Sequence, residues 1–499
     1  MSPVDPHSPG TGRQRLAVAT TVPGPNAAAA TAAAGAADPS LQRRVFGLAW
    51  PVISENFLQT MLGIVDTLLV AQLGTAAIAG VGSALQVMFF VVAALSAMSV
   101  GSSVLVAQAV GGRRYDNANL YAKQSVVWSL LLSIPMVIAG LALAGPILTV
   151  FGMAPDVTAI GTDYLRVTMG TVVVLTLLLL GGGVLRGAGD SRTPMIITMI
   201  INVINVVLTY ALIFGTWGLP ALGAVGSAWA TFIARALGCV MILMVLWRGR
   251  HGVSIRGRQG WMPSFTTARG ILNIGVPAAL EQLLITTAFL VLTVIVARLG
   301  TAALAAHRIA FNALSISFLP GIGFGIATTA LVGQAVGAHR MGEAAAVARI
   351  ATIWAMLWMG AIALLILFFA EPMMRAFSDD PVVVAMGAAG LRVVALAQPL
   401  WAILFVQSGA LRGAGNTRFP LRVNATGIWS AVLLSAALLA TVGGGLVSVW
   451  VSFLFTAPFT CGLMWWRFRR IVSEGVTPVA ADVVAADVVA ADAIPANAD

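Results

Sequence analysis

The sequence predicts an all-α integral membrane protein with twelve transmembrane helices in two parallel six-helix repeats, related by a pseudo-two-fold axis along the membrane normal. Three observations lead to this prediction. The chain of 499 residues is 59% hydrophobic and only 9% charged, whereas soluble domains carry about 25% charged residues. Basic residues gather in every second connection between long apolar runs, and one stretch of the chain recurs at a constant offset.

The apolar runs are close to the length that spans a bilayer as a helix, about 20 residues. A run such as SLLLSIPMVIAGLALAG (129–145) does not alternate apolar and polar residues, as the strands of a membrane barrel do. We therefore predict helices, in which every backbone polar group is satisfied within the segment. The predicted spans are 45–71, 84–110, 122–146, 157–185, 193–215, 222–247, 270–298, 308–336, 346–370, 382–411, 419–441 and 443–466.

The basic residues are distributed unequally between the two sides of the predicted membrane. Of the 28, one side carries 22 and the other five, and Arg235 lies inside a span. Because lysine and arginine accumulate in cytoplasmic loops, we predict a multi-pass protein of the bacterial inner membrane with both termini in the cytoplasm. The basic clusters contain no interleaved aromatic residues, so the net charge of +10 indicates topology and not a nucleic-acid partner.

Composition divides the chain into lobes and tails. Residues 1–40 are rich in alanine and proline, and residues 471–499 end in VAADVVAADVVAADA; we expect two disordered tails, the first cytoplasmic and the second acidic. Between them we predict an N-terminal six-helix lobe (41–247), a polar and basic cytoplasmic linker (248–269) and a C-terminal six-helix lobe (270–470).

The repeat relates these two lobes. Pro51 and Pro277 match, as do the QAVG motifs that begin at Gln108 and Gln334, and every such pair is 226 residues apart. Since six is an even number of spans, both copies enter the membrane from the same face. Parallel repeats of this kind occur in secondary transporters, with the substrate site between the lobes and alternating access by rocking.

One ten-residue motif occurs twice, as LRGAGDSRTP from Leu185 and as LRGAGNTRFP from Leu411. We predict that each copy is the cytoplasmic turn after the fourth helix of its lobe, with glycines for tight turning. The turn residues are Arg186, Gly187 and Gly189 in the first copy and Arg412, Gly413 and Gly415 in the second.

Four motifs in register resemble those of the multidrug and toxic compound extrusion (MATE) transporters. They are IVDTLLVAQLGTAAIAGVG closing the first span, LRGAGDSRTP after the fourth, NVINVVLTYALIFG in the fifth and GLPALGAVGSAWAT opening the sixth. The resemblance covers residues 45–466. It implies an antiporter that exports organic, often cationic, compounds in exchange for protons or sodium ions and needs no cofactor.

Acids inside spans are costly and therefore functional candidates. Asp66 stands where the resemblance places a first-helix acid, and its repeat position is Leu292. Glu55, eleven residues earlier, returns to the same helix face, and Gln59 lies near that face. We predict a polar stripe that relays a cation. The alternative for Asp66 is a structural hydrogen bond between helices.

Other polar residues extend the predicted coupling site. Asn202 and Asn205 match asparagine positions of the family, and we expect them to be hydrogen-bond partners in the N-terminal lobe, Asp66 included, or else packing residues. Glu281 is the repeat partner of Glu55, and the pair either relays cations or braces the lobes.

The C-terminal lobe departs from part of the family. Members that couple through this lobe carry acids where this chain has Trp401 and Ile285. The departure favours coupling through the N-terminal lobe, and protons over sodium ions.

The substrate cavity is harder to predict from the sequence. Met88, Trp401, Gln407, Gln59 and Tyr210 are candidates to line a central pocket, in which aromatic and thioether groups suit flat cations. The alternative for each is contact with lipid or a neighbouring helix.

Two other classes of function are the alternatives to an antiporter. An exporter or flippase of lipid-linked or other endogenous metabolites would favour basic grooves, but only Arg235 lies within a span. An intramembrane enzyme or metal site is not expected, because no two of the four histidines have ligand spacing and neither HExxH nor GxSxG occurs. The expected partners are small organic substrates and membrane lipid, with no nucleic acid and no obligate protein.

Overall fold

The computed structural model describes residues 38–441, 443 and 445–480, and its regular structure is helical apart from one bridge between Arg250 and Val253. The N-terminal lobe contains α2 (Pro39–Ala71), α3 (Thr75–Gly111), α4 (Tyr115–Thr149), α5 (Pro155–Gly170), α6 (Val172–Ala188), α7 (Arg192–Phe214), the short η1 (Thr216–Gly218) and α8 (Ala224–Arg248). The C-terminal lobe contains α9 (Phe265–Ala297), α10 (Thr301–Gly337), α11 (Met341–Arg375), α12 (Pro381–Gly413), α13 (Arg418–Thr441) and α14 (Gly445–Glu474).

The helices account for the predicted spans with two local differences. In the described part of the chain, ten helices are long and apolar enough to cross a membrane, and α5 with α6 forms one further span bent by 52°. The predicted span 157–185 is therefore broken at Thr171. The first span, α2, falls outside this set because polar side chains interrupt it; they include Glu55, Gln59 and Asp66.

The ends of the fold differ slightly from the predicted domains. The Asp38 side chain accepts a hydrogen bond from the Ser40 amide and caps α2, so the first lobe begins inside the predicted tail. The C-terminal lobe also extends beyond its predicted end at residue 470. Helix α14 runs to Glu474, and the structure describes residues 475–480 after it. The rest of both predicted tails lies outside the described residues.

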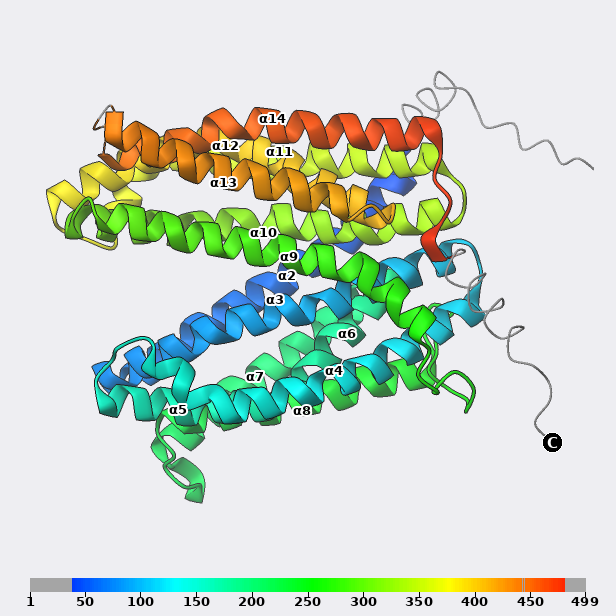
Figure 1. The fold of residues 1–499 in the computed structure, drawn as a ribbon, viewed down its shortest axis with the longest axis horizontal. Helices are drawn as coiled ribbons and strands as arrows, with labels where there is room; N and C mark the ends of the chain where they lie inside the picture. The colour runs from blue at the N-terminus through cyan, green and yellow to red at the C-terminus, as the bar shows by residue number, and fades with distance from the viewer. Residues whose placement is uncertain (1–37, 442, 444, 481–499) are drawn as a thin grey trace, which may run out of the picture.

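The two lobes lie side by side with their helices nearly along one direction (Figure 1). At the boundary between the lobes, α3 of the N-terminal lobe and α10 of the C-terminal lobe approach each other closely. A Cβ atom added to Gly111 would lie 1.9 Å from the Gln334 carbonyl oxygen, and one added to Gly337 would lie 1.9 Å from the Gln108 carbonyl oxygen. Small residues permit such close backbone approach between membrane helices.

The lobes are joined at one end of the bundle, which we call the basic end. It holds the turns 112–114, 189–191, 338–340 and 414–417 and the linker 249–264, where the arginines concentrate. Among the described residues, the side-chain hydrogen bonds and ion pairs between α2–α8 and α9–α14 all lie toward this end. One of them joins Arg44 to Glu343 at 2.8 Å. The structure is therefore closed at the basic end.

The segment after α14 adds to this closure. It leaves the C-terminal lobe and reaches the N-terminal lobe, as the red segment that descends from the end of α14 shows in Figure 1. The Tyr121 hydroxyl donates to the Ala480 carbonyl oxygen at 2.7 Å, and the Ala480 amide donates to Gln108 Oε1 at 3.2 Å. Val479 and Ala480 pack on the core of the N-terminal lobe, so the segment bridges both lobes.

Candidate functional site: a polar cavity in the N-terminal lobe

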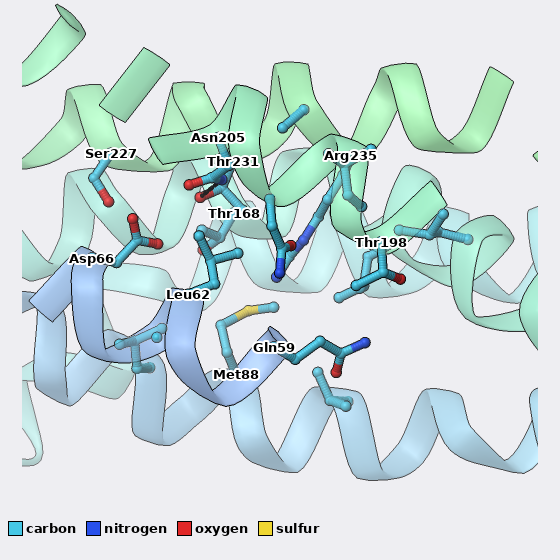
Figure 2. A pocket seen from close by; sticks show the side chains of 18 of the residues that line it. Gln59, Leu62, Asp66, Met88, Thr168, Thr198, Asn205, Ser227, Thr231 and Arg235 are labelled. Carbon is cyan, nitrogen blue, oxygen red and sulfur yellow. Dashed lines mark hydrogen bonds between the residues drawn. The ribbon is translucent and has the colours of Figure 1, made fainter. Parts of the chain in front are cut away.

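A cavity of about 460 Å³ lies inside the N-terminal lobe. Residues from α2, α3, α5, α6, α7 and α8 line it, and its walls are mainly apolar. Figure 2 shows Gln59 and Asp66 on α2 facing the helices that carry Asn205, Thr231 and Arg235. The polar groups therefore converge on one space from several helices.

The polar stripe predicted on α2 lines this cavity. Glu55, Gln59 and Asp66 all contribute to its wall, together with Met88 from α3. The spacing of four and seven residues returns each side chain to one face of a helix with 3.6 residues per turn. The three side chains of the stripe thus line one space.

Asp66 has an unsatisfied acceptor. Its Oδ1 is buried and has no hydrogen-bond partner among the described residues. Tyr164 and Arg235 line the same cavity as this carboxyl. Buried polar groups are ordinarily paired, so this carboxyl is equipped to take a proton or another cation.

The two asparagines on α7 bind other partners than Asp66. Asn202 Nδ2 donates to the Leu58 carbonyl oxygen on α2 at 2.9 Å. Asn205 Nδ2 donates to Thr231 on α8 at 3.0 Å, and its Oδ1 accepts from Thr209 at 3.1 Å. The asparagines therefore tie α7 to its neighbours α2 and α8.

Glu55 and Glu281 are each paired with the arginine of the repeated turn in their own lobe. Glu55 lies 3.1 Å from Arg186, and Glu281 lies 2.6 Å from Arg412. Glu281 also accepts from Asn424 and is only 1% exposed. These repeat-related pairs match the bracing alternative, and Glu281 lies in the C-terminal lobe, away from the cavity.

The repeated turns have the predicted glycine geometry. Gly189 and Gly415 have φ values of +97° and +86°, in the left-handed region. A Cβ atom on Gly187 or Gly413 would lie 2.5 Å from a carbonyl oxygen of the neighbouring helix. Glycine is thus required by backbone conformation at one position of each turn and by close packing at the other.

Three residues predicted for the substrate pocket lie outside the cavity. Tyr210 is 46% exposed and contacts Phe214, because it stands one position, about 100° of helix rotation, beyond Thr209. Trp401 packs against Phe318 with ring centroids 5.1 Å apart. Gln407 donates to Thr352 inside the C-terminal lobe.

The C-terminal lobe is apolar where the N-terminal lobe is polar. Leu292 and Ala431, at the repeat positions of Asp66 and Asn205, are fully buried. Trp401 and Phe453 contribute to the aromatic packing of this lobe. The polar groups of Asp66 and Asn205 therefore have no counterpart at the repeat positions of the C-terminal lobe.

Several polar residues of the cavity, among them Tyr164, Thr231 and Arg235, were not among the predicted site residues. Thr231 precedes Arg235 by one helical turn, which is a signal that the sequence does contain. The described residues contain no group of three or more His, Cys, Asp or Glu side chains that could hold a metal ion.

Comparison with known proteins decides the family. A family model, MatE, matches residues 51–211 and again residues 277–437, one copy in each lobe. The chain belongs to the MatE family. The Probable multidrug resistance protein NorM of Thermotoga maritima is 31% identical over 83% of this chain and 89% of its own length. The Multidrug resistance protein MdtK of Pectobacterium atrosepticum is 29% identical over 85% of this chain and 92% of its own.

Solved structures share the fold of this MatE chain. One described as the outward-facing conformation of a multidrug resistance MATE family transporter of the MOP superfamily has a TM-score of 0.82, with 22% identity over 87% of this chain and 96% of that chain. A MOP superfamily transporter from Pyrococcus furiosus, described as having a binding pocket of reversed polarity, has a TM-score of 0.81 with the same identity and coverage. The duplicated all-helical architecture is therefore that of this family.

Proposed function

We propose that this chain is a multidrug efflux antiporter that exports organic, cationic compounds in exchange for protons, with sodium ions as the alternative coupling ion. The observation that carries the proposal is the unpaired Asp66 carboxyl oxygen in the polar cavity. The names of the relatives, multidrug resistance proteins, support the multidrug efflux part of this proposal.

Competition at Asp66 explains how exchange would work. An ionised carboxylate attracts an organic cation into an apolar-walled cavity, where charge attraction is stronger than in water. A proton on the same carboxyl removes that attraction and releases the cation. Because one carboxyl serves both ligands, binding of one disfavours binding of the other.

The closed basic end defines the conformation in the proposed transport cycle. The arginine bias assigns this end to the cytoplasm, so the conformation described here is shut toward the cytoplasm. Export requires a second conformation that opens at the basic end. The hydrogen bonds from Gln108 to Gly413 and from Gln334 to Gly187 must break in that transition.

Transport in proteoliposomes tests this proposal. Efflux of ethidium would be measured under a pH gradient and, separately, under a sodium gradient, for the wild type, Asp66→Asn and the control Tyr210→Phe. We expect the pH gradient to drive transport in the wild type and in the control, but not in Asp66→Asn. Transport that is driven by neither gradient, or that is unchanged in Asp66→Asn, contradicts the proposal.

A further inference from the structure

Arg235 places a positive charge inside the cavity of a proposed cation exporter. It lies eleven residues into α8 (Ala224–Arg248), an apolar helix long enough to span the membrane, and its side chain lines the cavity. A charged group at such a depth is costly unless it is paired or faces a polar space. The position therefore requires an explanation.

No carboxylate in the cavity is bonded to Arg235. Four charged residues line the space: Glu55, Asp66, Arg186 and Arg235. Glu55 is already paired with Arg186. Asp66 and Tyr164 line the same cavity as Arg235, but among residues 38–441, 443 and 445–480 no ion pair or hydrogen bond joins the Arg235 guanidinium to any group.

The charges define what kind of ligand fits. A guanidinium offers five N–H donors and no acceptor, and it binds carboxylates through two parallel hydrogen bonds. A monocation bound at Asp66 leaves Arg235 without a counter-charge. A compound that carries a cationic group and one carboxylate satisfies both residues and adds no net charge to the cavity.

We propose that Arg235 forms a carboxylate subsite, so that the preferred cargo of this cavity is an organic zwitterion. Its cationic group lies on Asp66, its carboxylate on Arg235, and its apolar body against Leu62, Met88 and Leu175. The inference rests on the proposed export function and narrows its substrate class. One unpaired guanidinium matches one carboxylate and not a multiply charged phosphate.

Two dyes that differ at a single group test the subsite. Rhodamine 110 has a free carboxylate, and rhodamine 123 is its methyl ester and a monocation. Binding of each dye to the purified full-length protein is measured by fluorescence anisotropy, for the wild type, Arg235→Gln, Arg235→Lys and the control Tyr210→Phe. The quantity compared is the ratio of the two dissociation constants within one preparation.

We expect the wild type and Tyr210→Phe to bind rhodamine 110 more tightly than rhodamine 123. Arg235→Gln should weaken rhodamine 110 binding about tenfold or more, the usual loss for a hydrogen bond to a charged group, and leave rhodamine 123 unchanged or tighter. Arg235→Lys keeps the charge and should retain part of the preference. Because both dyes are measured on the same protein, a loss of folded material does not change the ratio.

Other results overturn the inference in distinguishable ways. If Arg235→Gln weakens both dyes equally, or neither, Arg235 has a structural role and the subsite is wrong. If the wild type prefers the ester, the cargo is a monocation and the export proposal survives without the subsite. If the wild type binds neither dye and exports no ethidium, the proposed function itself fails, and the subsite fails with it.

Discussion

Gln108 on α3 donates a hydrogen bond to the carbonyl oxygen of Gly413, 3.0 Å away in the opposite lobe. Gln334 makes the repeat-related bond to Gly187 at 2.9 Å. Each repeated Leu-Arg-Gly turn is therefore held by the QAVG motif of the other lobe. These reciprocal hydrogen bonds give the repeated turn a physical role, because they hold the basic end of the molecule closed.

Replacing both glutamines should open this end. In the double variant Gln108→Leu/Gln334→Leu, four hydrogen bonds at this end are lost: those to Gly413 and Gly187, and those that the glutamines accept from Ala480 and Arg44. Each contributes at least about 0.5–1.5 kcal/mol, so the population should shift toward a conformation open at the basic end. Spin labels at Val150 and Phe377, which are exposed at the opposite end of the two lobes, report the change. Their distance should shorten as the lobes rock, and an unchanged distance distribution would show that these bonds do not hold the closed state.

The glycines between α3 and α10 should be equally sensitive. A Cβ atom at Gly111 would lie 1.9 Å from the Gln334 carbonyl oxygen, so Gly111→Ala forces the helices apart. We expect the same shift in the label distance and a lower melting temperature in detergent. Gly360→Ala is the matched control, because a Cβ atom there meets nothing within 4 Å; equal behaviour of the two variants would refute the prediction.

The chain end should stabilise closure. A truncation after Glu474 removes the hydrogen bonds that Ala480 makes with Gln108 and Tyr121. We expect this truncation to shift the label distance in the same direction as the glutamine variants. A second truncation after Ala480 keeps both bonds and serves as the control. If the two truncations give the same distances, the segment 475–480 does not contribute to closure.

The two braced glutamates should differ in their importance for stability. Glu281 is 1% exposed and Glu55 is 12% exposed, and Glu281 has Asn424 as a second donor. Breaking a buried ion pair costs about 3–5 kcal/mol, so Glu281→Gln should lower the melting temperature more than Glu55→Gln. Thermal unfolding followed by size-exclusion chromatography measures both, and a larger loss for Glu55→Gln would contradict this ranking.

The fold was largely predictable from the sequence, because apolar length, arginine bias and the repeat each report on topology. The α2 stripe was also predictable, since Glu55, Gln59 and Asp66 are polar residues in an apolar helix. The rotation of the other helices about their axes was not predictable, because lipid and protein core are both apolar. The sequence therefore does not distinguish an exposed residue such as Tyr210, or a packed one such as Trp401, from a residue that lines the cavity. Arg235 was recognised as intramembrane, but its place in the cavity depends on packing across the lobe.

Competition between proton and cargo at Asp66 should make cation binding dependent on pH. A lower pH places a proton on the carboxyl, and the remaining Arg235 charge then repels a monocation. The dissociation constant of rhodamine 123 should therefore rise as the pH falls in the wild type and stay nearly constant in Asp66→Asn. Equal pH dependence in both proteins would assign the competition to another group that lines or adjoins the cavity, such as Glu55.

Proton release on cargo binding tests the central claim most directly. Ethidium is added to purified protein in weakly buffered solution at a pH where the carboxyl is partly protonated, and the pH change is recorded for the wild type, Asp66→Asn and Tyr210→Phe. We predict that the wild type and Tyr210→Phe release protons in proportion to bound ethidium and that Asp66→Asn releases none. Binding without proton release in the wild type, or equal release from Asp66→Asn, would contradict the assignment of coupling to Asp66.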